Sequence, residues 1–157
     1  MKNLEIERKF LILNNDFKKE SYKKERIIQG FLSSVPERTV RVRLTGDAGF
    51  ITVKGIGNEA GTTRFEWERE ISKQEAESLL EICEAGIIDK ERYYVKAGEH
   101  IFEIDEFELD NKGLVMAEVE LKNEEDSFEK PKWLGEEVTG QKKYYNSSLV
   151  KNPFQNW

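Results

Sequence analysis

The sequence predicts a mainly β protein in which about eight antiparallel strands can close into a barrel with a few flanking helices. Segments of alternating apolar and polar residues recur along nearly the whole chain, and this period of two residues is typical of strands. Short turns join most of these segments, which favours antiparallel neighbours. The interior of such a small barrel holds packed side chains or one small ligand.

The first half of the chain contains five of the expected strands. They are residues 3–12, 26–34, 38–46, 50–55 and 63–71. A short helix is expected within residues 16–24. Asp47, Ala48 and Gly49 supply a hairpin turn between the third and fourth strands.

The second half contains one clear helix and the remaining strands. Ser72 and Glu75 form a capping-box pattern that opens a helix over residues 72–86, and Gly86 is suited to its end. Strands are expected at 87–98, 100–110 and 114–122, and a C-terminal helix at 139–150. No repeat, low-complexity tract or linker interrupts the chain, so a single domain over residues 1–157 is expected.

The composition limits the classes of partner. The formal net charge of −6 provides no global field that attracts nucleic acid or an anionic membrane, so any bound anion needs a local cluster of Lys and Arg. The single cysteine excludes an internal disulfide and fits a reducing compartment. No apolar run approaches the roughly 20 residues of a membrane span, and the N-terminus leads directly into a strand pattern. A cytoplasmic protein is therefore expected.

The charges on the expected strands are grouped by sign. In residues 41–43 two arginines share a face opposite Val42, and in residues 117–121 two glutamates share a face opposite Val119. A solvated sheet face usually mixes signs within a strand, because opposite charges pair across strands. A sandwich with a solvated charged face still fits the alternation as well as a barrel with a charged interior does.

A charged interior would require a particular chemistry. Buried carboxylates without cations repel one another and stay protonated, but they are tolerated when they hold divalent metal ions, which prefer oxygen ligands. Arg and Lys without carboxylate partners suit a polyanion, because the planar guanidinium binds phosphate. Acids and bases together therefore indicate a phosphate–metal site, which phosphoryl transfer requires.

A series of short motifs follows the first strand in a fixed order. EIERKF at 5–10 has the pattern ExExK. The later motifs are QGF (29–31), RVR (41–43), TVK (52–54), RFEWE (64–68), KERYY (90–94), IDEF (104–107), AEVEL (117–121) and WLGEEVT (133–139). In this order they resemble the CYTH superfamily, also called triphosphate tunnel metalloenzymes. The chain looks most like the small bacterial branch, whose members hydrolyse inorganic tripolyphosphate. Where the family has QGY, this chain has Phe31 and lacks the hydroxyl.

The resemblance implies a tunnel in which bases hold a triphosphate and acids hold Mg²⁺ or Mn²⁺, as two ions. It assigns phosphate binding to Lys9, Arg41, Arg43, Lys54, Arg64, Lys90 and Arg92. It assigns metal binding to Glu5, Glu7, Glu66, Glu68, Asp105, Glu118 and Glu120. Among these residues, Glu7, Lys54 and Glu120 are expected to be catalytic.

The function expected from this resemblance is metal-dependent hydrolysis of inorganic triphosphate by a monomer or homodimer. The same superfamily contains class IV adenylate cyclases and thiamine triphosphatases, and both alternatives remain open. No set of residues dedicated to adenine or thiamine can be identified in the sequence, which favours the triphosphatase. A non-catalytic polyphosphate-binding module is a further alternative, although the acidic set argues against it, because bases alone would hold a polyanion.

Several conspicuous residues are expected to have structural roles only. Cys83 is expected in the core. Tyr144 and Tyr145 belong to the expected C-terminal helix, for which packing near one mouth of the tunnel is an alternative, although packing in the core is favoured. His100 is expected at the surface or in a turn and not as a general base.

Overall fold

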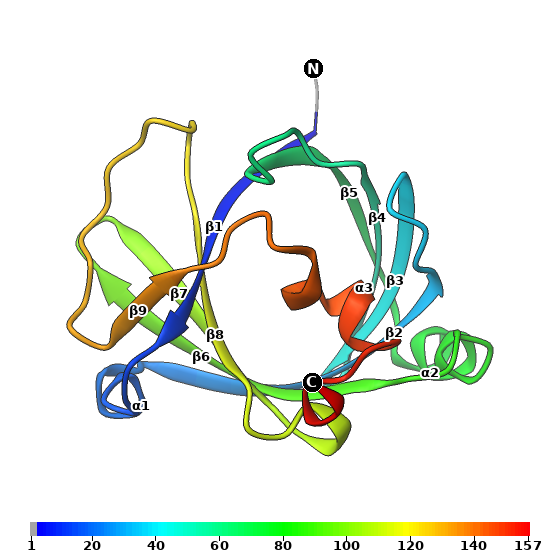
Figure 1. Ribbon diagram of the computed structural model, residues 1–157. Helices are drawn as coiled ribbons and strands as arrows, with labels where there is room; N and C mark the ends of the chain where they lie inside the picture. The colour runs from blue at the N-terminus through cyan, green and yellow to red at the C-terminus, as the bar shows by residue number, and fades with distance from the viewer. Residues whose placement is uncertain (1–2) are drawn as a thin grey trace.

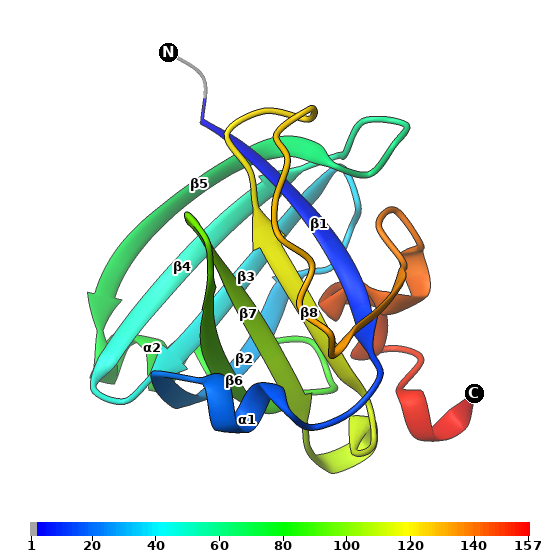
Figure 2. The same cartoon turned by 90° about the vertical axis from the view of Figure 1, so that its left-hand side faces the viewer.

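A computed structural model describes residues 3–157, which form a closed ring of eight antiparallel strands, as the sequence predicts (Figure 1). The ring consists of β1 (Leu4–Ile12), β2 (Lys23–Ser33), β3 (Arg38–Thr45), β4 (Ala48–Gly55), β5 (Thr63–Ser72), β6 (Ile88–Ala97), β7 (His100–Phe107) and β8 (Val115–Glu120). Their order around the ring is β5-β4-β3-β2-β6-β7-β8-β1, and β1 closes it by pairing with β5. Figure 2 shows the ring from the side, with its strands inclined as barrel closure requires.

A ninth strand, β9 (Leu134–Glu137), extends the sheet outside the ring and was not expected from the sequence. The pairing of β5 with β1 ends at Ile6. Beyond that residue, β9 pairs with Phe10 and Ile12 of β1. An unpaired strand edge readily accepts another strand, so β9 forms where β5 leaves the edge of β1 free.

The strand register gathers the charged faces on the inner side of the ring. Glu7 of β1 lies opposite Glu120 of β8, and Lys9 lies opposite Glu118. The residues that alternate with them point to the outer side. The interior is therefore charged, and the sandwich alternative is wrong.

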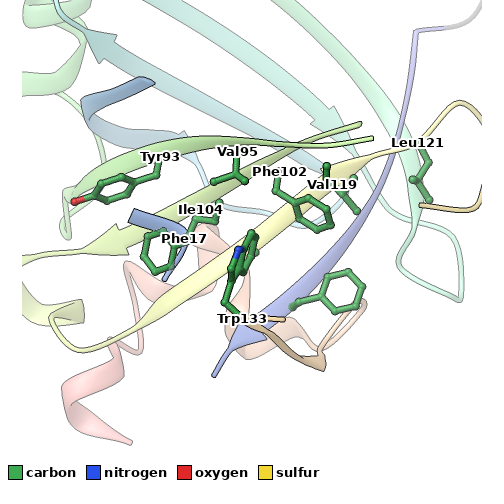
Figure 3. Close-up of a cluster of buried hydrophobic side chains, with 11 residues drawn as sticks. Phe17, Tyr93, Val95, Phe102, Ile104, Val119, Leu121 and Trp133 are labelled. Carbon is green, nitrogen blue, oxygen red and sulfur yellow. The ribbon is translucent and has the colours of Figure 1, made fainter. Parts of the chain in front are cut away.

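The larger apolar core packs on the outer surface of the barrel wall. Its buried members are Phe10, Phe17, Tyr93, Val95, Ala97, Phe102, Ile104, Ala117, Val119, Leu121 and Trp133. Phe17 of α1 (Phe17–Glu20) and Trp133 cover the wall, with ring centroids 5.3 Å from Tyr93 and 5.5 Å from Phe102, respectively (Figure 3). The larger share of the apolar burial that stabilises the fold thus lies outside the wall.

A helix covers another part of the outer wall. Helix α2 (Lys73–Glu81) begins with the expected capping box, in which Ser72 and Glu75 bond to each other's backbone N–H groups. Ala76 of this helix is fully buried. It packs so closely on Gly49 of β4 that a Cβ there would lie 2.7 Å from its own. A side chain at position 49 would therefore push the helix away.

Two sequence-based boundaries differ from the structure. Helix α2 ends before Gly86, because the Glu84 N–H bonds to the Phe31 carbonyl of β2 at 2.8 Å and pulls the chain out of the helix. The hairpin turn between β3 and β4 consists of Gly46 and Asp47, since β4 already begins at Ala48. Gly46 provides the positive φ of 58° that this tight turn requires.

Cys83 is only half-buried and not in the core.

The continuous helix expected over residues 139–150 is wrong. The segment forms the 3-10 helix η2 (Lys142–Tyr144) and the short helix α3 (Asn146–Leu149), separated by the extended residue Tyr145. Further 3-10 turns are η1 (Leu109–Asn111) and η3 (Phe154–Asn156). In Figure 1 this C-terminal segment lies within the outline of the ring. It breaks because Tyr144 and Leu149 turn inward and join the second apolar cluster, with Ile88, Phe107, Leu114, Met116 and Val138.

No helix among residues 3–157 is long and apolar enough to cross a membrane.

Candidate active site

A cavity lies inside the ring, between the charged faces of the strands and the C-terminal segment. Nine of the residues predicted for the site line it. The basic ones are Lys9, Arg41, Lys54, Arg64, Lys90 and Arg92, and the acidic ones are Glu5, Glu7 and Glu118. Bases outnumber acids two to one here, although the whole chain carries a net charge of −6. The cavity is therefore the kind of local basic cluster that attracts an anion.

Five predicted residues do not line this cavity. They are Arg43, Glu66, Glu68, Asp105 and Glu120. Glu66 lies beside a lining residue, with its Oε2 3.3 Å from Lys54 Nζ. Glu68 Oε2 accepts a hydrogen bond from Thr52 Oγ1 at 2.6 Å and lies 3.6 Å from Arg43 Nη2. Both glutamates thus support the basic groups from the β4–β5 side of the ring.

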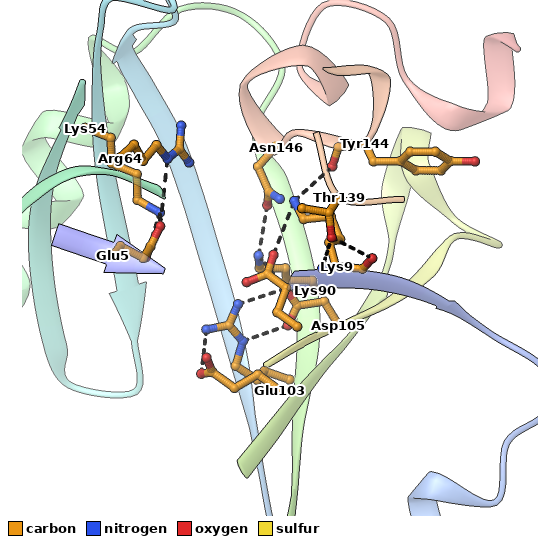
Figure 4. A network of polar contacts seen from close by, with 12 residues as sticks. Glu5, Lys9, Lys54, Arg64, Lys90, Glu103, Asp105, Thr139, Tyr144 and Asn146 are labelled. Atoms are coloured by element: carbon orange, nitrogen blue, oxygen red, sulfur yellow. Dashed lines mark hydrogen bonds and ion pairs between the residues drawn. The ribbon is translucent and has the colours of Figure 1, made fainter. Parts of the chain in front are cut away.

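The first charged group of the cavity surrounds Glu5. Lys54 Nζ donates to both carboxylate oxygens of Glu5, at 2.8 and 3.0 Å, and Arg64 Nε lies 3.8 Å from Oε1 (Figure 4). Burial raises the pKa of Glu5, although the ammonium of Lys54 opposes this shift. Glu5 therefore neutralises part of the basic cluster, and an anion that binds there must compete with its carboxylate.

The second charged group is built on Asp105. Arg92 donates to both oxygens of this carboxylate, at 2.7 and 2.9 Å, while Lys90 Nζ lies 2.8 Å from Oδ2. Burial alone would raise the pKa of Asp105, but Arg92 and Lys90 outweigh burial and lower this pKa to about 2. Burial lowers the pKa of Lys90 to about 8. Asp105 thus holds two cations in place at the cavity wall, because its oxygens are fully engaged with them.

The third group places Glu7 and Glu118 together at the cavity. Lys9 Nζ lies 3.3 Å from Glu118 Oε1. Burial raises the pKa of Glu118, but Lys9 and Arg92 outweigh burial and lower it below the usual range. Among the described residues that line the cavity, Glu7 is the one carboxylate without an ion pair. Burial, with the nearby carboxylates of Glu118 and Glu5, raises the pKa of Glu7 to about 8.

The arginines of β3 retain unused donors. The Nε atoms of Arg41 and Arg43 are buried, and within residues 3–157 they have no hydrogen-bond partner. Burial and the neighbouring guanidinium of Arg43 lower the pKa of Arg41. Two neighbouring guanidiniums with unused N–H groups are suited to donate hydrogen bonds to an anionic oxygen.

Glu120 is exposed at the C-terminal end of β8. It lines a second cavity together with Tyr94, Glu103 and Asp126. Burial, followed by the carboxylates of Glu5 and Glu103, raises the pKa of Glu120. Glu120 therefore lines a different cavity from Glu7, although the two residues are direct partners across β1 and β8 and the Glu5 carboxylate is near enough to raise the Glu120 pKa.

The C-terminal segment contributes cavity residues that the sequence analysis missed. Tyr145 and Asn146 line the cavity, and Tyr145 is not the core residue that was expected. The Tyr145 ring centroid lies 5.3 Å from Lys9 Nζ and 5.7 Å from Arg64 Cζ. Both residues belong to a tail without period-two alternation, so no pattern in the sequence placed them inside a barrel.

The carboxylates do not form a ready-made metal cluster. Among the described residues, no group of three or more His, Cys, Asp or Glu side chains is arranged to hold a metal ion. Glu5 and Glu118 instead pair with Lys54 and Lys9.

The sequence matches the family model described as the CYTH domain over residues 3–151. The chain belongs to the CYTH domain family. The resemblance drawn from the ordered motifs is thereby confirmed. The match spans all eight strands of the ring and extends through α3.

Two curated relatives of this CYTH protein are named inorganic triphosphatase. The one from Acetivibrio thermocellus is 44% identical over 154 residues, which cover 98% of this chain and 97% of the relative. The one from Nitrosomonas europaea is 34% identical, covering 93% of this chain and 96% of the relative. A crystal structure described as an inorganic triphosphatase aligns with a TM-score of 0.64 at 32% identity, covering 92% of this chain and 96% of that one.

Proposed function

We propose that this CYTH protein hydrolyses inorganic tripolyphosphate to pyrophosphate and phosphate with the help of divalent metal ions. The observation that carries the proposal is the cavity in which six basic side chains and three carboxylates converge inside a closed barrel. The names of the two curated relatives support the same activity.

The basic residues would bind the phosphate chain. Arg41 and Arg92 supply guanidinium donors, and Lys54 and Lys90 supply ammonium donors, all from strands that face the cavity. In the reaction, water attacks the terminal phosphorus and the bridging P–O bond breaks, so charge develops on the leaving pyrophosphate. Cations held in place before the reaction stabilise that charge without reorganisation. Pyrophosphate leaves as a stable anion, so the protein needs no nucleophile of its own.

The carboxylates fit a divalent cation. Glu5, Glu7 and Glu118 offer the oxygen ligands that Mg²⁺ and Mn²⁺ prefer, and Glu7 is a half-buried carboxyl group that forms no ion pair with a lysine or arginine of the cavity. Such a cation supplies Lewis acidity toward phosphate oxygens and lowers the pKa of bound water. Glu5 would then bind the metal ion in place of the Lys54 ammonium. That ammonium would be free to bind the phosphate chain.

The test is release of phosphate and pyrophosphate from tripolyphosphate, ATP and thiamine triphosphate, each with Mg²⁺, with Mn²⁺ and with a chelator. Tripolyphosphate is expected to be hydrolysed fastest, and only with metal. Cyclic AMP from ATP would instead establish a cyclase, and tight binding without turnover would establish a binding module.

The Glu7→Gln variant is expected to lose most of the activity, on the order of 100-fold, because it removes an anionic oxygen ligand of the divalent cation. Glu70→Gln is the matched control, since Glu70 lies on the same face of β5 as Glu66 and Glu68 but is exposed at the end of the strand. A Glu7→Gln rate near that of Glu70→Gln would contradict the role of Glu7.

A further inference from the structure

Asn146, the first residue of α3, forms a polar contact that no expected role explains. Its Oδ1 accepts one hydrogen bond from Lys90 Nζ at 2.8 Å (Figure 4). It accepts another from Gln29 Nε2 at 2.6 Å. Lys90 is only 2% exposed and Gln29 is fully buried. A neutral residue of the C-terminal segment is thus tied to a cation of the cavity wall.

The neighbours of Asn146 fix the orientation of its amide. An ammonium group has three donors and no acceptor, so Lys90 can face only the Oδ1 atom of the amide. Turning the amide over would place its NH₂ group against the ammonium. With Oδ1 occupied by two donors, the NH₂ group is left facing away from Lys90 and Gln29. Among residues 3–157 no acceptor is paired with this Nδ2, and Asn146 lines the cavity.

The preceding residue brings further cationic groups to the same place. The ring of Tyr145 lies against Lys9 and Arg64, and the Tyr144 carbonyl accepts a weak hydrogen bond from Lys9 Nζ at 3.5 Å. The C-terminal segment therefore contacts three basic residues of the wall and presents an unused N–H donor among them. An N–H donor in such surroundings is complementary to an anionic oxygen.

We infer that Asn146 is a substrate-binding residue, whose Nδ2 donates a hydrogen bond to a phosphate oxygen of the bound triphosphate while its Oδ1 holds Lys90. This inference rests on the proposed function, because it takes the ligand of the cavity to be a triphosphate. It adds to the predicted basic residues a neutral donor that comes from outside the barrel strands.

Two substitutions distinguish direct binding from an indirect role through Lys90. Asn146→Ala removes both the donor and the acceptor. Asn146→Asp keeps the acceptor for Lys90 and Gln29 but replaces the NH₂ group with a carboxylate oxygen that repels phosphate. The control is Asn152→Asp, the same change at an exposed position of the C-terminal segment.

The experiment measures KM and kcat for tripolyphosphate with Mg²⁺, and tripolyphosphate binding by calorimetry with a chelator, after thermal melting has shown that each variant is folded. Asn146→Ala is expected to weaken binding about tenfold and Asn146→Asp about 100-fold or more, while Asn152→Asp stays at the wild-type value. If Asn146→Ala does not fold, Asn146→Asp carries the test, because it retains the contacts to Lys90 and Gln29.

An Asn146→Asp variant that binds as tightly as wild type would overturn the inference, whatever Asn146→Ala does, because a carboxylate oxygen in place of the Nδ2 donor would repel a phosphate oxygen bound there. A wild-type protein that neither binds nor hydrolyses tripolyphosphate would refute the proposed function, and the role of Asn146 with it.

Discussion

Two carboxyl groups of the interior, the buried Asp105 and the half-buried Glu7, have opposite electrostatic surroundings. Asp105 accepts hydrogen bonds from Arg92 and has its pKa lowered to about 2, whereas burial and neighbouring carboxylates raise the pKa of Glu7 to about 8. A carboxylate whose oxygens are occupied by cations has a positioning role, and a carboxylate without a partner is suited to a ligand. The sequence alone could not separate these roles, because both residues are acidic and both occupy inward-facing positions of their strands.

The role of Asp105 can be tested through stability. Asp105→Asn leaves the buried Lys90 without its carboxylate partner and leaves Arg92 with Glu103 alone, so the free energy of unfolding is expected to fall by about 3 kcal/mol. Asp89→Asn is the matched control, because Asp89 forms the same two-pronged pair with Arg26 at an exposed position, where such pairs contribute little. Urea denaturation at pH 7 measures both. Equal losses in the two variants would contradict the positioning role.

At the scale of elements, the strands followed from the sequence and the C-terminal segment did not. Alternation of apolar and polar residues is a local signal, and it identified all eight strands of the ring within a few residues. The C-terminal segment folds according to distant contacts, since its shape depends on the second apolar cluster and on a close approach to the loop before β5. No local pattern records such contacts, so Tyr145 and Asn146 were missed.

Gly61 and Gly140 form that close approach, and it can be tested by substitution. A Cβ on Gly61 would lie 2.3 Å from the Cα of Gly140, and Gly61 also has a positive φ of 73°. Gly46→Ala is the control, because Gly46 has a φ of 58° and nothing within 4 Å of a Cβ. Both variants place an alanine in the left-handed region of backbone conformation, which costs about 1 kcal/mol. Gly61→Ala is expected to lose about 1–3 kcal/mol more through steric overlap.

Chemical denaturation gives these losses, and trypsin cleavage after Lys142 or Lys143 reports whether the C-terminal segment leaves the barrel. Faster cleavage in Gly61→Ala than in Gly46→Ala is expected. Equal stability and equal cleavage of the two variants would mean that the loop before β5 does not hold the segment.

For the whole molecule, the charged interior and the external core are two sides of one pattern. Most wall strands direct the charges of the site inward and apolar residues outward, and α1, α2 and Trp133 cover the apolar side. The side of each strand on which a residue lies could be read from the sequence, and nine of the residues predicted for the site line one cavity. Position along the barrel axis could not be read, because it depends on register. Glu120 consequently faces the second cavity.

The most direct test of the whole account is a crystal structure with tripolyphosphate and Mn²⁺, using the anomalous signal of manganese to locate the metal. The account predicts Mn²⁺ against the carboxylates of Glu5, Glu7 and Glu118, and the phosphate chain along the basic residues of the same cavity. Manganese in the second cavity, or tripolyphosphate outside the barrel, would contradict the claim that the acidic and basic side chains inside the ring form a triphosphate–metal site.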